Sequence, residues 1–484
     1  MVKKALKNGI LFIVIIFFFF LSMVLCCCFP SDAIEENVIE SSKILLNEGM
    51  YIHAGPSIAD NGVDALIINA AYSVDNKNPV VSALTVRKNY NEKTTVTEMH
   101  DVKGDIMTFQ HPKEQIEIIE IDGRLYSKDK RENIEVEGDI WSVDKTSYKV
   151  NIHGNEFYLN VYNSIKELDK FLRGEVDTSV EYARYWHGYL PIIRVMLLFM
   201  NIQEIRILTM IVMNAMLIYF LIILNRNFGK KITIIIGFSL IFYNYIFIGY
   251  TLSAVQIFAV MMLASIILIK KIENKKDFDF NTYMLIVGML TNFMDYLTVP
   301  LVTFGLPMII YLLHKKNESI SWKEGFILLF KAGIMWGLGY TLTFFSKWVI
   351  VECILGRNMI SSGIEQIFFR TTGDIFRKLE MSLSEIIIFY LLFVFMACLI
   401  VEFIFLMKYK FCVKKDIKQI LINNIPMFLI GVMPVVWHIV LANHTQDHWK
   451  YHYRDMFIVC ISFLIVLNDI FELKKRKAIL ESEK

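Results

Sequence analysis

The stretch that decides the fold is "MVKKALKNGILFIVIIFFFFLSMVLCCCF", residues 1–29. Three lysines precede an apolar run of about 20 residues, the length that an α-helix needs to cross a bilayer. A secretory signal peptide also begins with lysines and an apolar run, but this run is long and no Ala-x-Ala-like cleavage site follows it. We therefore interpret residues 1–28 as a retained transmembrane anchor that begins in the cytoplasm.

The composition extends this interpretation to most of the chain. Of its 484 residues, 55% are hydrophobic, more than the roughly 45–50% of soluble domains. The sequence predicts a mainly α, polytopic helical membrane protein with about ten transmembrane helices, counting the N-terminal one. The other expected spans are 205–224, 232–248, 251–269, 282–297, 299–313, 326–348, 385–406, 424–442 and 456–471.

The lysines in the connecting segments give the sidedness of these spans. Cytoplasmic loops of membrane proteins are enriched in Lys and Arg. Alternate connections are Lys-rich: "NRNFGKK", "KKIENKKD", "HKKNES", "KYKFCVKKDIK" and the tail "ELKKRK". The sequence therefore predicts a multi-pass protein of the cell membrane with both termini in the cytoplasm. Four segments then fall on the outer face: residues 29–190, the turn 295–298, the loop 346–384 and the stretch 441–457.

A polar region separates the first two spans and is expected to form a small extracytoplasmic α/β domain. Residues 36–54 and 60–75 have the pattern of helices. Residues 80–163 contain alternating runs such as "QIEIIEI" and "NEFYLNVY", split by Asp-Gly and His-Gly turns, which is typical of β-hairpins. The expected domains are the anchor 1–28, the outer domain 29–185, the multi-span domain 186–472 and a basic tail, 473–484.

Polar residues converge on the predicted outer face, where an ionisable group near the membrane suggests function or pairing. We expect substrate-binding residues in "EYARYWHGYLPIIRVML" (181–197), in "TNFMDYLTVPLVTFGLP" (291–307) and at the end of the span 326–348. Each group also has a structural alternative, namely an aromatic belt, a snorkelling arginine or a helix cap. The residues are Arg184, His187, Arg194, Asp295 and Lys347.

The stretch "LANHTQDHWKYHYRDMF", residues 441–457, is the fourth polar group. In a helix, His444, His448 and His452 would share a face, and zinc sites use such spacing. A divalent metal is therefore one interpretation, although no cysteine or compact carboxylate set completes a ligand shell. We favour a rim that binds phosphate, because a guanidinium such as that of Arg454 can bind two phosphate oxygens at once. His444 and His448 would then be hydrogen-bond partners.

This plan of one span, a large outer loop and many further spans resembles the GT-C superfamily of glycosyltransferases. "YWHGYLPIIRVMLLFMNIQEIRIL" occupies the place where that superfamily often has a His-Pro-Pro-type motif before its second span. Three pieces also resemble a group of bacterial membrane proteins with GT-C-like topology. They are "GPSIADNGVDALIINAAY", "YARYWHGYLPIIR" with "MDYLTVPLVTFGLP", and "NHTQDHWKYHYRD".

The resemblance implies transfer of a sugar from a polyprenyl-phosphate donor to a cell-envelope acceptor on the outer face. It places the general base in the first outer loop, where the candidates are Asp60 and Asp64. The cations that would hold the leaving phosphate are Arg184, Arg194, Lys347 and Arg454. Membrane lipid, the lipid-linked donor and the acceptor are the expected partners. No cofactor beyond a divalent metal at the histidines is implied, and no nucleic acid.

Two other functions compete with this one. The chain would instead be another envelope enzyme or polymerase that handles lipid-linked saccharides, or a non-catalytic transporter or assembly protein for envelope polysaccharide. A transporter should show internal repeats and midplane polar residues, and the sequence shows neither. No Gly-rich phosphate loop occurs in the inner loops, which argues against a nucleotide-sugar enzyme of the cytoplasmic face.

Overall fold

The computed structural model describes residues 2–47, short strands between 65 and 160, residues 168–175 except 170, and two longer stretches. These are 183–371 without 253, 276, 277 and 296, and 409–475 without 415 and 442–452. The chain is mainly helical and divides into two compact units. One consists of Met1–Ala33 and Glu181–Lys484, and the other of Ile34–Val180.

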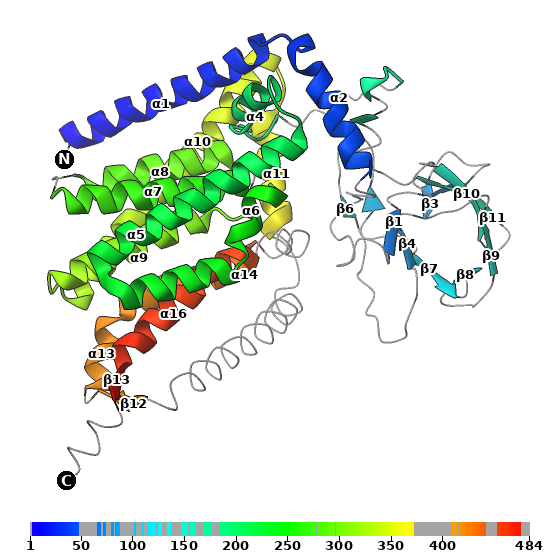
Figure 1. Cartoon of the computed structure of the whole chain (residues 1–484). Coiled ribbons are helices and arrows are strands. Elements are labelled where there is room, and N and C mark those ends of the chain that lie inside the picture. The colour runs from blue at the N-terminus through cyan, green and yellow to red at the C-terminus, as the bar shows by residue number, and fades with distance from the viewer. Residues whose placement is uncertain are drawn as a thin grey trace. The chain divides into compact units, whose positions relative to one another are not determined.

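The first unit is built from helices, several of which run alongside one another in Figure 1. Four of the described helical segments are long and apolar enough to cross a membrane, or five if the bent pair α13–α14 is one span. The helices are α1 (Val2–Cys28), α4 (Leu190–Leu197), α5 (Ile202–Phe242), α6 (Tyr245–Thr251), α7 (Val255–Glu273), α8 (Phe280–Met294), α9 (Leu301–Asn317), α10 (Trp322–Leu355), α11 (Met359–Thr371), α13 (Ile417–Asn423), α14 (Ile425–Val440) and α16 (Phe457–Ile470).

The expected spans and the observed helices differ in several places. The spans 205–224 and 232–248 fall within α5 and α6, with a break at Gly229, whose φ of 80° is left-handed. Helices α8, α9 and α16 have 15, 17 and 14 residues, shorter than the roughly 20 residues of a typical span. The expected outer loop 346–384 is wrong in its first part, because α10 continues to Leu355 and α11 follows. The span 385–406 lies outside the described residues.

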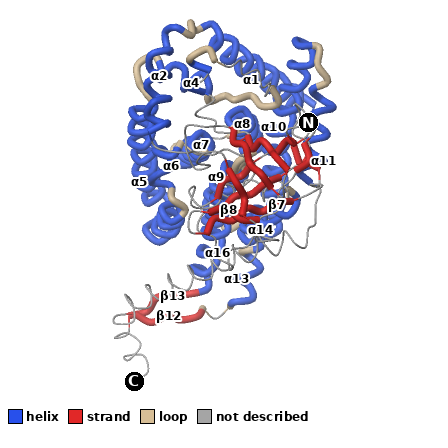
Figure 2. Tube along the Cα trace, turned by 90° about the vertical axis from the view of Figure 1, so that its right-hand side faces the viewer, coloured by secondary structure: helices blue, strands red, loops and turns tan. Residues whose placement is uncertain are grey.

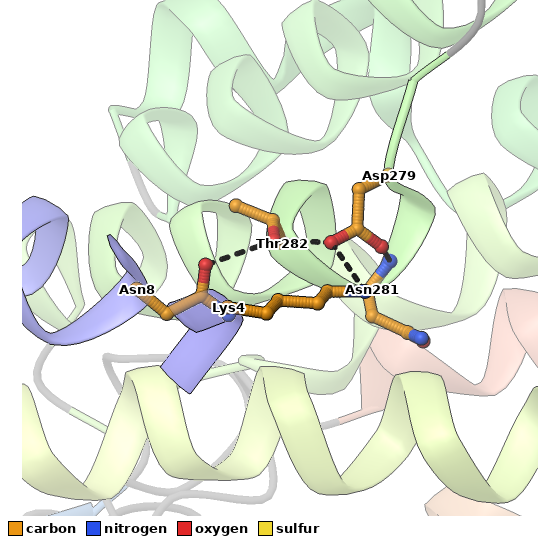
Figure 3. Close-up of polar contacts among 5 residues, drawn as sticks. All are labelled: Lys4, Asn8, Asp279, Asn281 and Thr282. Atoms are coloured by element: carbon orange, nitrogen blue, oxygen red, sulfur yellow. Dashed lines mark hydrogen bonds and ion pairs between the residues drawn. The ribbon is translucent and has the colours of Figure 1, made fainter. Parts of the chain in front are cut away.

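Helix α1 is tied to the beginning of α8 by polar contacts (Figure 3). Lys4 Nζ lies 2.8 Å from Asp279 Oδ2, and Thr282 Oγ1 lies 2.6 Å from the same oxygen and 3.1 Å from Asn8 Oδ1. Asp279 also caps α8, accepting from the backbone N–H of Asn281 at 3.3 Å. The two helices therefore begin at the same end of the unit.

The pKa of Asp279 is lowered, so the ionised carboxylate stabilises the folded chain. Burial opposes this shift, but the hydrogen bonds from Lys4 and Thr282 outweigh it. This stabilisation is present above the ordinary aspartate pKa of about 3.9 and is lost as the pH falls through the lower folded value. Asp279→Asn keeps the cap and removes the charge. Because the pair is partly exposed, we expect a loss below about 1 kcal/mol.

Thermal unfolding of the purified protein at pH 7 and at pH 3 would measure this effect. The difference between Asp279→Asn and the parent should be present at pH 7 and shrink at pH 3. Asp416→Asn is a matched control, since Asp416 is the N-cap of α13 but its side chain makes no capping hydrogen bond. An equal difference at both pH values would show that the ion pair is not responsible.

Three further helix termini meet through Lys316, near the end of α9. Its Nζ donates to Asn424 Oδ1, at the beginning of α14, at 3.2 Å. It also pairs with Asp469, near the end of α16. Helices α9 and α16 end near Lys316, and α14 begins there. The start of α9, the start of α16 and the end of α14 therefore lie away from Lys316. We call the two sets of termini, at Lys4 and at Lys316, the basic ends.

Two strands lie side by side beyond α13 and α16 (Figure 2). They are β12 (Tyr409–Val413) and β13 (Phe471–Lys475), paired antiparallel with Tyr409 opposite Lys475. Residues 408–418 were expected to form a loop and residues 472–477 to begin the tail, so neither strand was predicted. The run "YKFCV" contains two aromatic residues and one β-branched residue, types that are enriched in strands.

Helices α8 and α10 approach closely at two glycines. A Cβ atom on Gly288 would lie 2.1 Å from the carbonyl oxygen of Trp336, and one on Gly339 would lie 2.2 Å from that of Leu285. Small residues allow membrane helices to pack backbone against backbone. A buried hydroxyl pair, Thr291 and Thr303 at 2.7 Å, joins α8 to α9 nearby.

The second unit contains α2 (Asp32–Asn47) and a nine-stranded sheet in the order β1-β4-β7-β8-β9-β10-β11-β2-β3. Strands β7 and β8 form a hairpin whose innermost pair is Ile121 and Arg124, and β10 and β11 form one whose innermost pair is Ile152 and Asn155. Both hairpins turn at the predicted Asp-Gly and His-Gly positions. The strands are β1 (Ala65–Ile68), β2 (Ala71–Ser73), β3 (Pro79–Val81), β4 (Ala83–Arg87), β5 (Asp101–Val102), β6 (Phe109–Gln110), β7 (Gln115–Ile121), β8 (Arg124–Ser127), β9 (Asn133–Val136), β10 (Ser147–Ile152) and β11 (Asn155–Asn160).

The expected helix 60–75 is wrong, because β1 and β2 occupy its second half. The run "ALII" is short and wholly apolar, and periodicity alone cannot distinguish a buried strand from a helix in such a run. The expected helix 36–54 is confirmed as far as Asn47, where α2 ends. The rest of that range lies outside the described residues.

Candidate functional site

The segment before α4 lies against the ends of α8 and α10 that are remote from the basic ends. Trp186 is 1% exposed, and its indole Nε1 donates to the carbonyl oxygen of Thr343 at 2.8 Å. The backbone N–H of Gly188 donates to the carbonyl oxygen of Phe293 at 2.8 Å. Phe19 of α1 stacks on Phe293, with ring centroids 4.0 Å apart. Helices α1, α8 and α10 therefore fix this segment in place.

Two cations lie on consecutive aromatic rings of this segment. Lys347 Nζ is 5.3 Å from the centre of the Trp186 ring, and Arg370 Cζ is 5.9 Å from that of Tyr185. Both contacts are within cation–π range. Among the described residues, no carboxylate oxygen lies within 4.0 Å of either cation. A ring face supplies less charge than a carboxylate, so both cations can still accept an anion.

Asp295, expected as a substrate-binding residue, is 1% exposed at the end of α8. Its Oδ1 accepts from the backbone N–H of Thr298 at 2.9 Å and from its hydroxyl at 2.6 Å. The hydroxyl of Tyr340 lies 3.5 Å from Oδ2, and one turn further along α10 the Phe344 ring lies 5.5 Å from the Tyr185 ring, centroid to centroid. The carboxylate thus stabilises the turn before α9 and also faces the neighbouring aromatic groups.

These groups form one cluster, which we call the aromatic-end cluster. Three of its residues come from different stretches that the sequence analysis singled out, but Tyr185, Tyr340 and Arg370 were missed. The spacing of Trp336, Tyr340 and Lys347 on one helix face was a usable signal for Tyr340. Arg370 had no such signal, because its segment was expected to be a loop. The cluster consists of Tyr185, Trp186, Asp295, Tyr340, Lys347 and Arg370.

The remaining expected residues of the 181–197 stretch have other surroundings. Arg194 Nη2 donates to the carbonyl oxygen of Phe29 at 2.9 Å, which ties α4 to the end of α1. His187 has a left-handed φ of 54°, and its Nδ1 lies 3.1 Å from the Tyr189 hydroxyl. Arg184 is half-buried. For Arg194 this contact fits the structural alternative better than a ligand site.

A second buried polar group lies where α14 ends and α16 begins. His438 Nε2 is 3.1 Å from Asp455 Oδ1, and these side chains are 4% and 0% exposed. Asp455 belongs to a short 3₁₀ turn, η1 (Tyr453–Met456), in which Arg454 is also buried, its Cζ 5.0 Å from the Tyr453 ring. Arg454 was expected at the surface as a phosphate anchor, and His438 was not predicted as a site residue. The described contacts do not join this group to the aromatic-end cluster.

Several predicted residues lie outside the described part of the chain. They are Asp60 and Asp64, expected as the general base, and His444 and His448, expected as partners of a phosphate or ligands of a metal. Among the described side chains, no group of three or more His, Cys, Asp or Glu residues is arranged to hold a metal ion. The predictions for these four residues stay predictions.

Comparison with protein-family models, with curated proteins and with solved structures found no match for the chain. The class of the protein therefore rests on its own features. These are a mainly helical fold with apolar helices long enough to cross a membrane, and buried polar groups gathered near helix termini.

Proposed function

We propose that the chain is a multi-pass protein of the cell membrane that moves a sugar from a polyprenyl-phosphate donor to a cell-envelope acceptor at the extracytoplasmic face. In this proposal the chain has about ten spans and both termini in the cytoplasm. An extracytoplasmic α/β domain lies between the first two spans. The resemblance to GT-C glycosyltransferases motivates the chemistry. The lysine distribution motivates the sidedness.

The observation that carries this proposal is the position of Lys347. Its ammonium lies on the ring of a fully buried tryptophan, with no described carboxylate within 4.0 Å. Charges removed from water are normally paired, so an anionic ligand is a suitable partner. A lipid-linked phosphate carries a negative charge at the level of the lipid headgroups. Membrane-spanning helices end at the same level.

The contacts between helix termini fit this sidedness. The contacts of Lys4 with Asp279 and of Lys316 with Asn424 and Asp469 gather five helix termini at the basic ends. The aromatic-end cluster lies where α8 ends and α9 begins, so it belongs to the opposite ends of these helices. A cytoplasmic location for the basic ends gives the cluster an extracytoplasmic location.

The residues take distinct roles in this proposal. Lys347 and Arg370 bind the donor phosphate and stabilise its charge as the sugar leaves. Asp295 positions Tyr340 and the turn before α9. Asp60 or Asp64 takes the proton of the acceptor hydroxyl as the sugar bond forms. His444 and His448 stay proposed as hydrogen-bond partners of the donor phosphate, whereas Arg454, the expected anchor, is buried in η1.

A transporter of envelope polysaccharide is the second candidate, and one observation favours it. The His438–Asp455 pair is buried in the helical unit, and buried histidine–carboxylate pairs serve as proton relays in membrane transporters. Such a protein would move its substrate without making a glycosidic bond.

The experiment that tests the proposal uses the full chain purified in detergent or reconstituted in vesicles. It should transfer radiolabelled sugar from a polyprenyl-phosphate donor to an envelope acceptor, and uptake into vesicles without bond formation would favour the transporter. Reporter fusions after Asn274 and Lys316 should read cytoplasmic, and a fusion after Asn155 external. A cytoplasmic result at Asn155 would overturn the assigned face and the function with it.

A further inference from the structure

Helix α11 packs on the end of α10 by one of its faces. Gly356, with a left-handed φ of 64°, ends α10, and Glu352 Oε2 accepts from the backbone N–H of Ile360 at 3.1 Å. A Cβ atom on Gly363 would lie 2.5 Å from the Trp348 ring, so this face of α11 packs directly on α10. The helix is therefore folded back onto the end of α10 in a fixed orientation.

A second face of α11 is apolar and exposed. Ile364, Ile367 and Phe368 are 45%, 48% and 65% exposed, and the spacing of i, i+3 and i+4 puts them on one ridge. Ser361 and Glu365, on the next part of the surface, are exposed and polar. An apolar ridge beside a polar face is typical of a helix that lies in the membrane interface.

The last turn of α11 brings a cation back to the cluster. Arg370 is seven residues after Gly363, so both lie on the face toward α10, and its guanidinium stands over the Tyr185 ring. The apolar ridge is thus next to a cation that has no described carboxylate within 4.0 Å. A molecule with an acyl or prenyl chain and a phosphate has the matching chemistry.

We propose that α11 lies in the outer-leaflet interface, with Ile364, Ile367 and Phe368 against lipid chains, and that Arg370 binds the phosphate of a membrane lipid. The lipid is a single-phosphate amphiphile such as a polyprenyl phosphate. This inference rests on the sidedness of the proposed function but not on sugar transfer. Binding without transfer would refute the transferase and leave this proposal intact.

The test is titration of the purified full chain in detergent with polyprenyl phosphate, followed by native mass spectrometry. Arg370→Gln should weaken binding roughly ten-fold or more, the usual effect of losing a hydrogen bond to a charged group. Arg370→Lys should weaken it less. Arg357→Gln is the matched control, an exposed arginine between α10 and α11, and should bind like the parent. Unchanged binding by Arg370→Gln would overturn the proposal.

The ridge is tested with the double variant Ile367→Asn and Phe368→Asn. Both side chains are exposed, so its unfolding temperature in detergent should stay near that of the parent. Loss of apolar contact should weaken binding of polyprenyl phosphate roughly three- to ten-fold. Equal binding by this variant would refute the role of the ridge. Displacement of the lipid by millimolar inorganic phosphate would assign Arg370 to free phosphate and overturn the lipid assignment.

Discussion

Replacement of Gly339 by alanine is expected to lower the unfolding temperature of the purified protein sharply. The new methyl group would lie 2.2 Å from the carbonyl oxygen of Leu285. That oxygen is part of the backbone of α8 and cannot turn aside as a flexible side chain can. The two helices must separate by about 1 Å, and overpacking of this kind costs roughly 1–3 kcal/mol. Gly288→Ala should behave in the same way, because its methyl group would meet the carbonyl oxygen of Trp336.

The same helix offers a matched control for this prediction. Gly337 is two residues from Gly339, and a Cβ atom there would have no heavy atom within 4 Å. Gly337→Ala should leave the unfolding temperature unchanged or raise it, since alanine favours a helix by up to about 1 kcal/mol over glycine. If Gly339→Ala and Gly337→Ala unfold at the same temperature, the close approach of α8 and α10 is wrong.

The link between Gly339 and the aromatic-end cluster explains why the site was hard to predict. Asp295 and Tyr340 are 45 positions apart, and they meet because Gly288 and Gly339 let α8 and α10 touch. Polar residue types and their spacing pointed separately to Asp295, to Lys347 and to the stretch 181–197 that contains Trp186. They do not reveal which helix lies beside which, because many arrangements of helices would bury the same apolar faces.

The fold was predictable where a long apolar run alone determines the structure. This holds for α1, α7 and α10, whose runs are longer than any strand. The prediction failed at the far end of α10, which was placed at residue 348, and the residues that follow were expected to form a loop. The helix in fact continues to Leu355, and the Lys347 ammonium lies over the Trp186 ring. The neighbouring α11, with Arg370, was missed for the same reason.

The prediction with the largest expected effect on activity concerns the cation on which the proposed function rests. Lys347→Gln removes the charge and keeps most of the side-chain stem. If Lys347 stabilises the leaving phosphate, sugar transfer should fall roughly 10²-fold or more, the usual effect of losing one donor to a developing negative charge. The loss should appear in kcat, whereas a purely structural role would lower the unfolding temperature. Lys347→Arg should retain part of the activity.

Lys323 provides the matched control on the same helix. It is exposed in the first turn of α10, and its Nζ lies 5.8 Å from the Trp322 ring, a cation–π contact like that of Lys347 at the opposite end. Removing either lysine loses a similar ring contact, worth about 0.5–2 kcal/mol, so stability should change little and to a similar degree in both. Transfer by Lys323→Gln should equal that of the parent. If Lys347→Gln transferred sugar as fast as the parent, the main support for a phosphate at the aromatic-end cluster would be lost. If a chelator abolished transfer, a metal at His444 and His448 would be favoured instead.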